Sequence, residues 1–383
     1  MTDKSVRLLL ILVGGVAVIV VAFHPKRGAD SRIAPVASGD RPNVPPASPI
    51  SGLALKAGRS TDSAFHEAFE AARTGADARS MRQRLAELRD RLAAMPRQEA
   101  VAAVRKWLDS KTDAPTHLGF QLASNGQLDE APTLRTFLLD ELGRLDPAAA
   151  ADEAKVILAS MDSPDEWAVA LRDLALGDSS DAGRQLLEQK MSDMLGYAAW
   201  QQNPSVGYLE AFDVAVYLGG TDLLPALSGL VRTQDNPAVA HASYLALDRL
   251  VIKDPTTTLG ALEQDPTMME GRESTRADYF ARANVADAQQ RQIVEAYLLN
   301  PEISGNELNT FASVFPNANF MVSPNLLTQT ALPDRAALDD LDSASLSVVQ
   351  QWQADPRFAN LQPALQKMAG RLQLFMQQTA ANQ

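Results

Sequence analysis

Cysteine is absent from the 383 residues. This absence excludes disulfide bonds, thiolate metal sites, a cysteine nucleophile and the attachment cysteine of a lipoprotein. It does not identify a redox compartment, because a chain without thiols is chemically safe in any of them. Apolar residues make up 46% of the chain, so a sizeable core can be buried.

Motifs of known catalytic sites are also absent. The chain has no Gly-x-Ser-x-Gly, no Walker loop and no Gly-x-Gly-x-x-Gly. His66 and Glu70 share a predicted helix face, but the second histidine of a zinc-protease motif is missing. An acidic cluster at 339–342 lacks the glycine spacing of a calcium loop. We therefore expect no catalytic residue, no metal site and no cofactor, although an enzyme with an unrecognised active site stays open as an alternative.

The net charge is −12, and it is unevenly distributed. Basic residues gather near the N-terminus and within 79–111, so the remaining body is strongly acidic. An acidic surface repels phosphate backbones, which argues against nucleic acid as the main partner.

An unbroken apolar run extends from Leu8 to Phe23, preceded by Lys4 and Arg7. As a helix of about 24 Å it is slightly short for the hydrocarbon core of a bilayer and slightly long for a signal-peptide core. We expect residues 1–24 to be an uncleaved single-pass membrane anchor, with a cleaved signal peptide as the alternative. The body would then face the periplasm or the exterior from the inner membrane, or be secreted.

Residues 25–60 change character. Prolines alternate with Ala, Ser, Gly and Asp, and apolar periodicity is lost. This composition predicts an extended, disordered linker that holds the body away from the bilayer.

The body carries helix signals and few strand signals. A short polar residue followed by proline recurs, and this pair suits a helix start because the side chain caps free N–H groups and proline fits the first turn. The pairs are Asp146-Pro147, Ser163-Pro164, Asn203-Pro204, Asn236-Pro237, Asp254-Pro255, Asp265-Pro266, Asn300-Pro301, Ser323-Pro324 and Asp355-Pro356. Most precede apolar residues at helical spacing, so we predict an all-α body.

Two segments, Glu166–Gly177 and Asn236–Asp248, resemble the first helix of a HEAT-type repeat, and each precedes a second amphipathic helix. The resemblance covers about residues 130–265, although the regular Asp/Arg ladder of such repeats is not evident. It implies an α-solenoid-like array of helical hairpins with a surface for another macromolecule, and it implies no chemistry. We place the HEAT-like repeats at 112–270 and a further helical region at 271–383.

Residues 61–111 are predicted to form a separate basic helical hairpin. Met81, Leu85, Leu88, Leu92 and Met95 follow heptad spacing over two heptads. The opposite side carries a basic strip, which is either a solvated face beside the acidic body or a surface resting on anionic lipid head groups. The strip consists of Arg82, Arg84, Arg89 and Arg91.

Asparagine and phenylalanine are concentrated within 304–325. Asparagine offers a donor and an acceptor, and phenylalanine offers a rigid apolar anchor, which together suit partner recognition. Helix capping and core filling are the alternative roles. The candidate partner-binding residues are Phe315, Asn317, Asn319, Phe320 and Asn325.

From these patterns we expect a noncatalytic helical-repeat scaffold in the cell envelope that binds a protein partner. A membrane-anchored chaperone for a secreted enzyme is the alternative. Steric lipase foldases resemble this layout of anchor, spacer and helical body, but their Arg-x-x-Phe-Asp-Tyr motif is missing here.

Overall fold

The computed structural model describes residues 10–13, 16–19, 61–232 and 235–381. The chain divides into two units, Met1–Ser63 and Ala64–Gln383, and we describe each by itself.

In the first unit, β1 (Leu10–Val13) and β2 (Val16–Ile19) pair antiparallel, with Leu10 opposite Ile19 and Val13 opposite Val16. A continuous helix was expected here. The β-branched valines and isoleucines of this run also suit strands. The remainder of the expected anchor or signal segment and the linker at 25–60 lie outside the described residues. Among the described residues, no helix combines the length and apolar character needed to cross a bilayer.

The second unit begins with three helices where a hairpin was expected: α1 (Thr61–Arg73), α2 (Ala78–Ala94) and α3 (Arg97–Asp109). Asp77 caps α2 by accepting from the N–H groups of Arg79 and Ser80. The heptad residues Met81, Leu85, Leu88 and Leu92 are buried, as their spacing predicts.

A small hairpin, β3 (Gln121–Leu122) and β4 (Leu128–Glu130), precedes the main stack. Its turn contains Asn125-Gly126, and Gly126 has a φ of +79°. The hairpin was not predicted, because its strands are short and contain no β-branched residue. Gly126 lies close to the backbone of Leu326, which is far along the chain.

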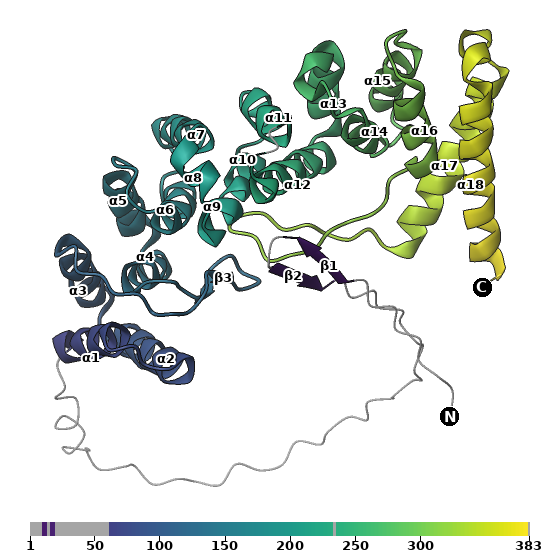
Figure 1. The fold of residues 1–383 in the computed structure, drawn as a ribbon. Coiled ribbons are helices and arrows are strands. Elements are labelled where there is room, and N and C mark those ends of the chain that lie inside the picture. The colour runs from purple at the N-terminus through teal and green to yellow at the C-terminus, as the bar shows by residue number, and fades with distance from the viewer. Residues whose placement is uncertain (1–9, 14–15, 20–60, 233–234, 382–383) are drawn as a thin grey trace, which may run out of the picture. The chain divides into compact units, whose positions relative to one another are not determined.

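Helices then follow one another with short joints (Figure 1). The first group comprises α4 (Leu134–Leu145), α5 (Pro147–Ile157), α6 (Pro164–Gly177), α7 (Asp181–Leu195), α8 (Ala198–Gln202), α9 (Val206–Glu210) and α10 (Phe212–Leu218). The second comprises α11 (Leu224–Arg232), α12 (Pro237–Lys253), α13 (Pro255–Gln264), the 3-10 helix η1 (Pro266–Met269), α14 (Glu273–Phe280), α15 (Ala288–Leu299) and α16 (Gly305–Val314). The chain ends with α17 (Arg335–Ala354), the 3-10 helix η2 (Pro356–Leu361) and α18 (Gln362–Ala381).

Each helix packs mainly against near neighbours in sequence. Examples are α4 with α5 and α6, α5 with α6, α11 with α12, α13 with α15, α14 with α16, and α17 with α18. The predicted all-α class is therefore confirmed for the body. The expected subdivisions at 111 and 270 fall within one compact unit.

Polar-proline pairs start helices α5, α6, α12 and α13 and the 3-10 helices η1 and η2, and in each the polar side chain accepts a backbone N–H. Such caps contribute about 1 kcal/mol each. The other three pairs do not start helices. Ser205 caps α9 and Ser304 caps α16, each shortly after the expected pair. Ser323-Pro324 lies in an extended segment.

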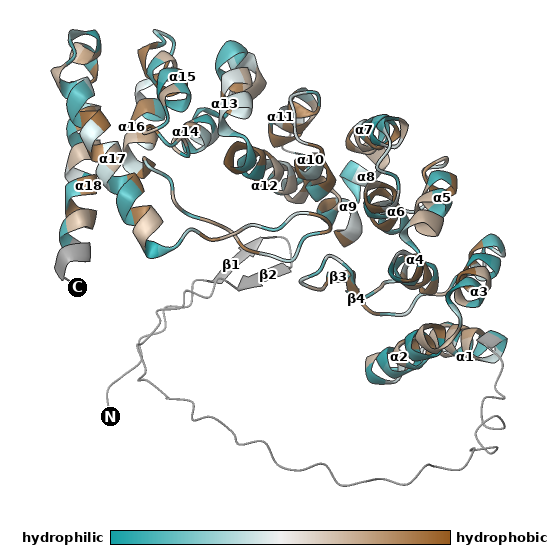
Figure 2. Ribbon diagram, turned by 180° about the vertical axis from the view of Figure 1, so that it is seen from behind, coloured by the Kyte–Doolittle hydropathy of each residue, from teal (hydrophilic) through white to brown (hydrophobic). Residues whose placement is uncertain are grey.

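One apolar core runs through the second unit, from Ala64 to Leu372. Val239, Ala246, Leu247, Leu250 and Val251 of α12 are all buried, and α10 and α12 are strongly apolar along their length (Figure 2). A helix buried over so much of its surface lies inside the stack rather than on its outside.

Candidate partner-binding face

Buried acid–arginine pairs join successive helices of the stack. Asp140 on α4 accepts from Arg172 on α6, Asp213 on α10 from Arg249 on α12, Asp248 on α12 from Arg282 after α14, and Glu307 on α16 from Arg276 on α14. The N–O distances are 2.5–2.6 Å. We call α4, α6, α10, α12, α14 and α16 the ladder helices.

The partners in these four pairs are separated by 32, 36, 34 and 31 residues. That separation matches two helices plus their joints. The ladder was not evident in the sequence, because the separation varies and the arginine precedes the acid in the last pair, so no fixed motif recurs. Side chains paired in this way fix the register of one layer on the next.

An extended segment leaves α16 and returns to α17. We call this segment, residues 315–334, the strap. Figure 1 shows it running back past α14, α12 and α10 before it turns towards α17. The twelve residue-to-residue steps from 315 to 327 can span about 40 Å when extended. Three sets of contacts hold the strap along the ladder helices.

The first contact lies just after α14. The N–H of Asn317 donates to the carbonyl of Ala281 at 2.7 Å, and Arg282 donates to the carbonyl of Asn317 at 3.1 Å. The guanidinium of Arg282 also lies 5.5 Å from the centre of the Phe320 ring. Because Arg282 is paired with Asp248, this contact is built on the ladder.

The second contact lies between α10 and α12. One oxygen of Asp213 accepts the backbone N–H groups of Leu327 and Thr328, at 2.6 and 2.9 Å. The other oxygen accepts the Thr328 hydroxyl and the guanidinium of Arg249. Arg249 also donates to the Thr328 hydroxyl oxygen. Asp213 is 3% exposed, and both of its carboxylate oxygens bond to the strap.

The third contact is a close approach of two backbones. A Cβ built on Gly126 would lie 2.3 Å from the carbonyl oxygen of Leu326. The Leu326 side chain is itself buried. The carbonyl of Gly126 accepts from Arg172, which also contacts Asp140 and Asp173. Only glycine at 126 leaves room for the strap.

The predicted partner-binding residues have mixed outcomes. Phe315 is a correction: it is fully buried and packs against Phe311 and Trp352, so it is a core residue. Asn317 and Asn325 are half-buried and bond within the chain, Asn325 to the carbonyl of Thr328. Phe320 lies half-buried on Arg282, and Asn319 is exposed.

The strap's most exposed apolar residues were missed. Met321, Val322 and Leu332 are 45%, 56% and 62% exposed. The contact residues Asp213, Arg249 and Thr328 were missed as well, because nothing in the local sequence connects positions so far apart. The concentration of asparagine and phenylalanine did identify the first half of the strap.

The basic strip is largely neutralised. Arg82 pairs with Glu130 at 2.5 Å, Arg84 with Glu87 at 3.0 Å, and Arg89 with Glu141 at 2.6 Å. Arg91 is half-buried; the hydrogen bond from Gln83, then the contact with Arg84 and last the charge of Arg91 lower the pKa of Glu87. These pairs favour the interpretation of the strip as a face bound to the chain's own carboxylates.

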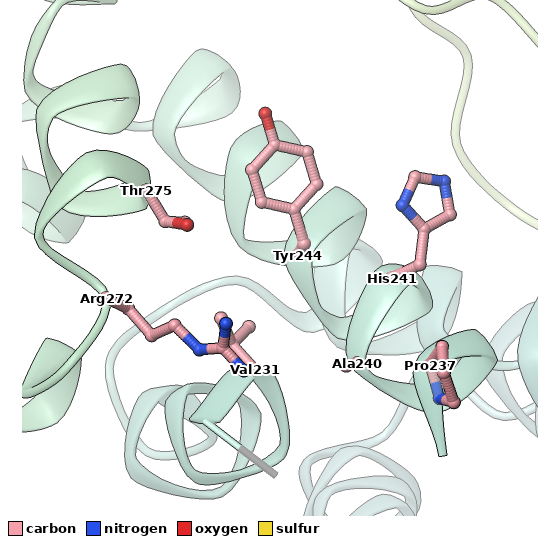
Figure 3. Close-up of a pocket in the computed structure, with 7 residues that line it drawn as sticks. All are labelled: Val231, Pro237, Ala240, His241, Tyr244, Arg272 and Thr275. Atoms are coloured by element: carbon pink, nitrogen blue, oxygen red, sulfur yellow. The ribbon is translucent and has the colours of Figure 1, made fainter. Parts of the chain in front are cut away.

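A cavity of about 320 Å³ lies between α11, α12 and α14. Figure 3 shows Arg272 and Thr275 on one side and His241 and Tyr244 on the other. The ring of His241 stacks on that of Tyr244, and the partial desolvation of His241 lowers its pKa. Arg272 donates to the carbonyl of Arg232, so the cavity offers one cation and two stacked rings.

Glu210, at the end of α9, is the most perturbed carboxyl near the strap. Burial, and then the negative charge of Asp213, raise its pKa to about 7, while Arg249 lowers it. Among the described residues, no group of three or more acidic or histidine side chains is placed to share a metal ion.

Comparisons of this chain with protein-family models, with curated proteins and with solved structures each gave no match.

Proposed function

We propose that the chain is a noncatalytic scaffold of the HEAT-like α-solenoid type, exposed in the cell envelope, that binds a protein partner along its ladder helices. One observation carries this proposal: the ladder helices already bind an extended polypeptide, the strap, through the buried carboxylate of Asp213, and the β3–β4 turn approaches it closely at Gly126. A surface that recognises backbone groups suits a protein ligand better than a small substrate.

Exposed apolar side chains on the strap support the same proposal. The side chains of Met321, Val322 and Leu332 are exposed. Contacts of Asn317 with Arg282 and of Leu327 with Asp213 hold the strap on either side of Met321 and Val322. Apolar side chains held on a rigid framework are typical of interaction sites. Envelope exposure rests on the apolar run from Leu8 to Phe23 and the proline-rich segment after it.

Site-specific photo-crosslinking of the full chain in its native membrane fraction tests the proposal. A crosslinking residue at Met321 or Leu332 is expected to capture one distinct protein. The matched control is Val156, an apolar residue on α5 that is at least as exposed as Met321 and Leu332 and is expected to capture none. Crosslinks from Val156 alone, or from no position, would contradict a partner-binding role for the ladder helices.

A further inference from the structure

The strap contact at α10 has the properties of a peptide-binding site with a defined preference. We define the strap site as Gly126, Asp213 and Arg249. We propose that it accepts an extended segment of a partner protein with the pattern Leu-x-Thr or Leu-x-Ser, and that Leu326-Leu327-Thr328 of the strap occupies it until the partner replaces it. This inference deepens the proposed function and rests on it.

Recognition of the main chain comes from one oxygen of Asp213. It accepts two consecutive N–H groups, those of Leu327 and Thr328, at 2.6 and 2.9 Å. This arrangement requires an extended segment without proline at either position, but it does not depend on the side chain at 327. Bonds to a charged acceptor are about twice as strong as neutral ones.

Selectivity for a hydroxyl comes from the pairing of Asp213 with Arg249. The Thr328 hydroxyl donates to Asp213 and accepts from Arg249. A hydroxyl group is both donor and acceptor within one atom, which valine or alanine cannot reproduce. A segment with valine in this place would leave the guanidinium and the carboxylate without these bonds.

The burial of Leu326 indicates selectivity for an apolar residue two positions before the hydroxyl-bearing residue. The Leu326 side chain is 2% exposed, and its carbonyl lies where a side chain at 126 would be. Gly126 is held in turn by Arg172. The leucine position and the hydroxyl position are therefore set by two different parts of the ladder.

Replacement of the strap does not require the helices to separate. The strap residues on either side of the site, Met321, Val322 and Leu332, are exposed. The helices that the strap connects pack independently of it, α16 against α18 and α17 against α18. The internal segment has an effective concentration in the millimolar range, so a free peptide competes only when the strap is weakened.

The test uses the full chain in detergent and a fluorescent peptide with the sequence of residues 321–331. The strap is weakened by Leu326→Ala with Thr328→Val, which leaves the strap site intact. We expect this variant to bind the peptide saturably, and the native chain to bind it at least about tenfold more weakly. A peptide with Thr328→Val is expected to bind the variant about tenfold more weakly, and one with Gln329→Ala, at an exposed position, to bind unchanged.

A second route avoids any folding defect of the variant. Cleavage sites for a specific protease placed after Val322 and after Leu332 allow the folded chain to be cut, and the same peptide is then added. Asp213→Asn in either background is expected to reduce binding. Absence of peptide binding in both the variant and the cut chain overturns the inference, and so does equal binding of the Thr328→Val peptide. A dimer that excludes the peptide overturns it as well, because a second copy then fills the site.

The two proposals fail in different ways. If the peptide binds but no position crosslinks to a cellular protein, the proposed function fails. If crosslinks form at Met321 but the peptide does not bind, only the strap-site inference fails.

Discussion

Asp213 on α10 accepts the backbone N–H of Leu327 at 2.6 Å, although 114 residues separate the two. This contact uses the same carboxylate that pairs with Arg249 on α12. The layering of the helices and the position of the strap therefore depend on one side chain.

Asp213→Ala is expected to destabilise the body strongly. The change leaves Arg249 and two N–H groups of the strap without their acceptor, and breaking a buried ion pair costs about 3–5 kcal/mol. Asp193→Ala is the matched control, since Asp193 pairs with Lys190 at the surface and such pairs contribute about 0–1 kcal/mol. Urea unfolding of the two variants measures the difference. Equal free energies of unfolding would show that the Asp213 contacts are unimportant.

Gly126→Ala is expected to detach the strap. The added Cβ would lie 2.3 Å from the carbonyl oxygen of Leu326, so either the strap or the β3–β4 turn must move. Gly75→Ala controls for the backbone alone, because Gly75 has a similar φ of +72° and nothing within 4 Å of its Cβ. Limited proteolysis should cut residues 320–332 faster in the first variant only. Equal rates in both would contradict the close approach.

Arg172→Met is expected to destabilise the ladder. Arg172 is buried and bonds Asp140, Asp173 and the carbonyl of Gly126. Its loss leaves carboxylates in a buried site, at a cost of about 3–5 kcal/mol. Arg172→Lys should recover only part of this, because one ammonium cannot match the planar fork. Arg73→Met, at an exposed pair with Glu70, is the control and should cost less than about 1 kcal/mol. Thermal unfolding of all three variants decides the order.

Stability is expected to fall as the pH rises from 5 to 8. Burial raises the pKa of Glu210 from 4.5 to about 7 and that of Asp173 from 3.8 to about 6. The folded state therefore binds more protons than the unfolded state in this window, and the stabilisation is lost as each group ionises. For Glu210 the change is at most about 3 kcal/mol, and solvent at this half-buried position reduces it.

Glu210→Gln checks this sign. The variant should unfold at the same urea concentration as the native chain near pH 5 and at a higher one near pH 8. Asp178, whose pKa is lowered to about 2 by its hydrogen bonds from Lys155 and Ser180, titrates well below this window and does not interfere. Parallel pH profiles for variant and native chain would contradict a raised pKa at Glu210.

Local signals predicted the helices well, because they depend on residues close in sequence. Asp254-Pro255 places a cap and a first-turn proline side by side, and α13 begins there. Within the predicted helical region at 271–383, α14 ends at Phe280, and Asn284 and Asp287 bond to backbone groups before α15 begins. Such a break depends on side-chain bonds that apolar periodicity does not record.

The candidate site depended on contacts that local signals cannot reveal. The asparagine and phenylalanine content marked the start of the strap, yet Phe315 is in the core. The residues that hold the strap, Asp213 and Gly126, are identified only when the fold brings them to Leu326 and Thr328. Local signals can also mislead: Ser323-Pro324 has the same pattern as the pairs that start helices elsewhere, but it lies in an extended segment.

The central claim is that the ladder helices hold an extended polypeptide through Asp213. Amide hydrogen exchange of the full chain at single-residue resolution tests it most directly. We expect the amides of Leu327 and Thr328 to exchange at least about a hundredfold more slowly than those of Met321 and Val322, and Asp213→Asn to reduce that protection. Exchange at Leu327 and Thr328 as fast as at Met321 would contradict the claim.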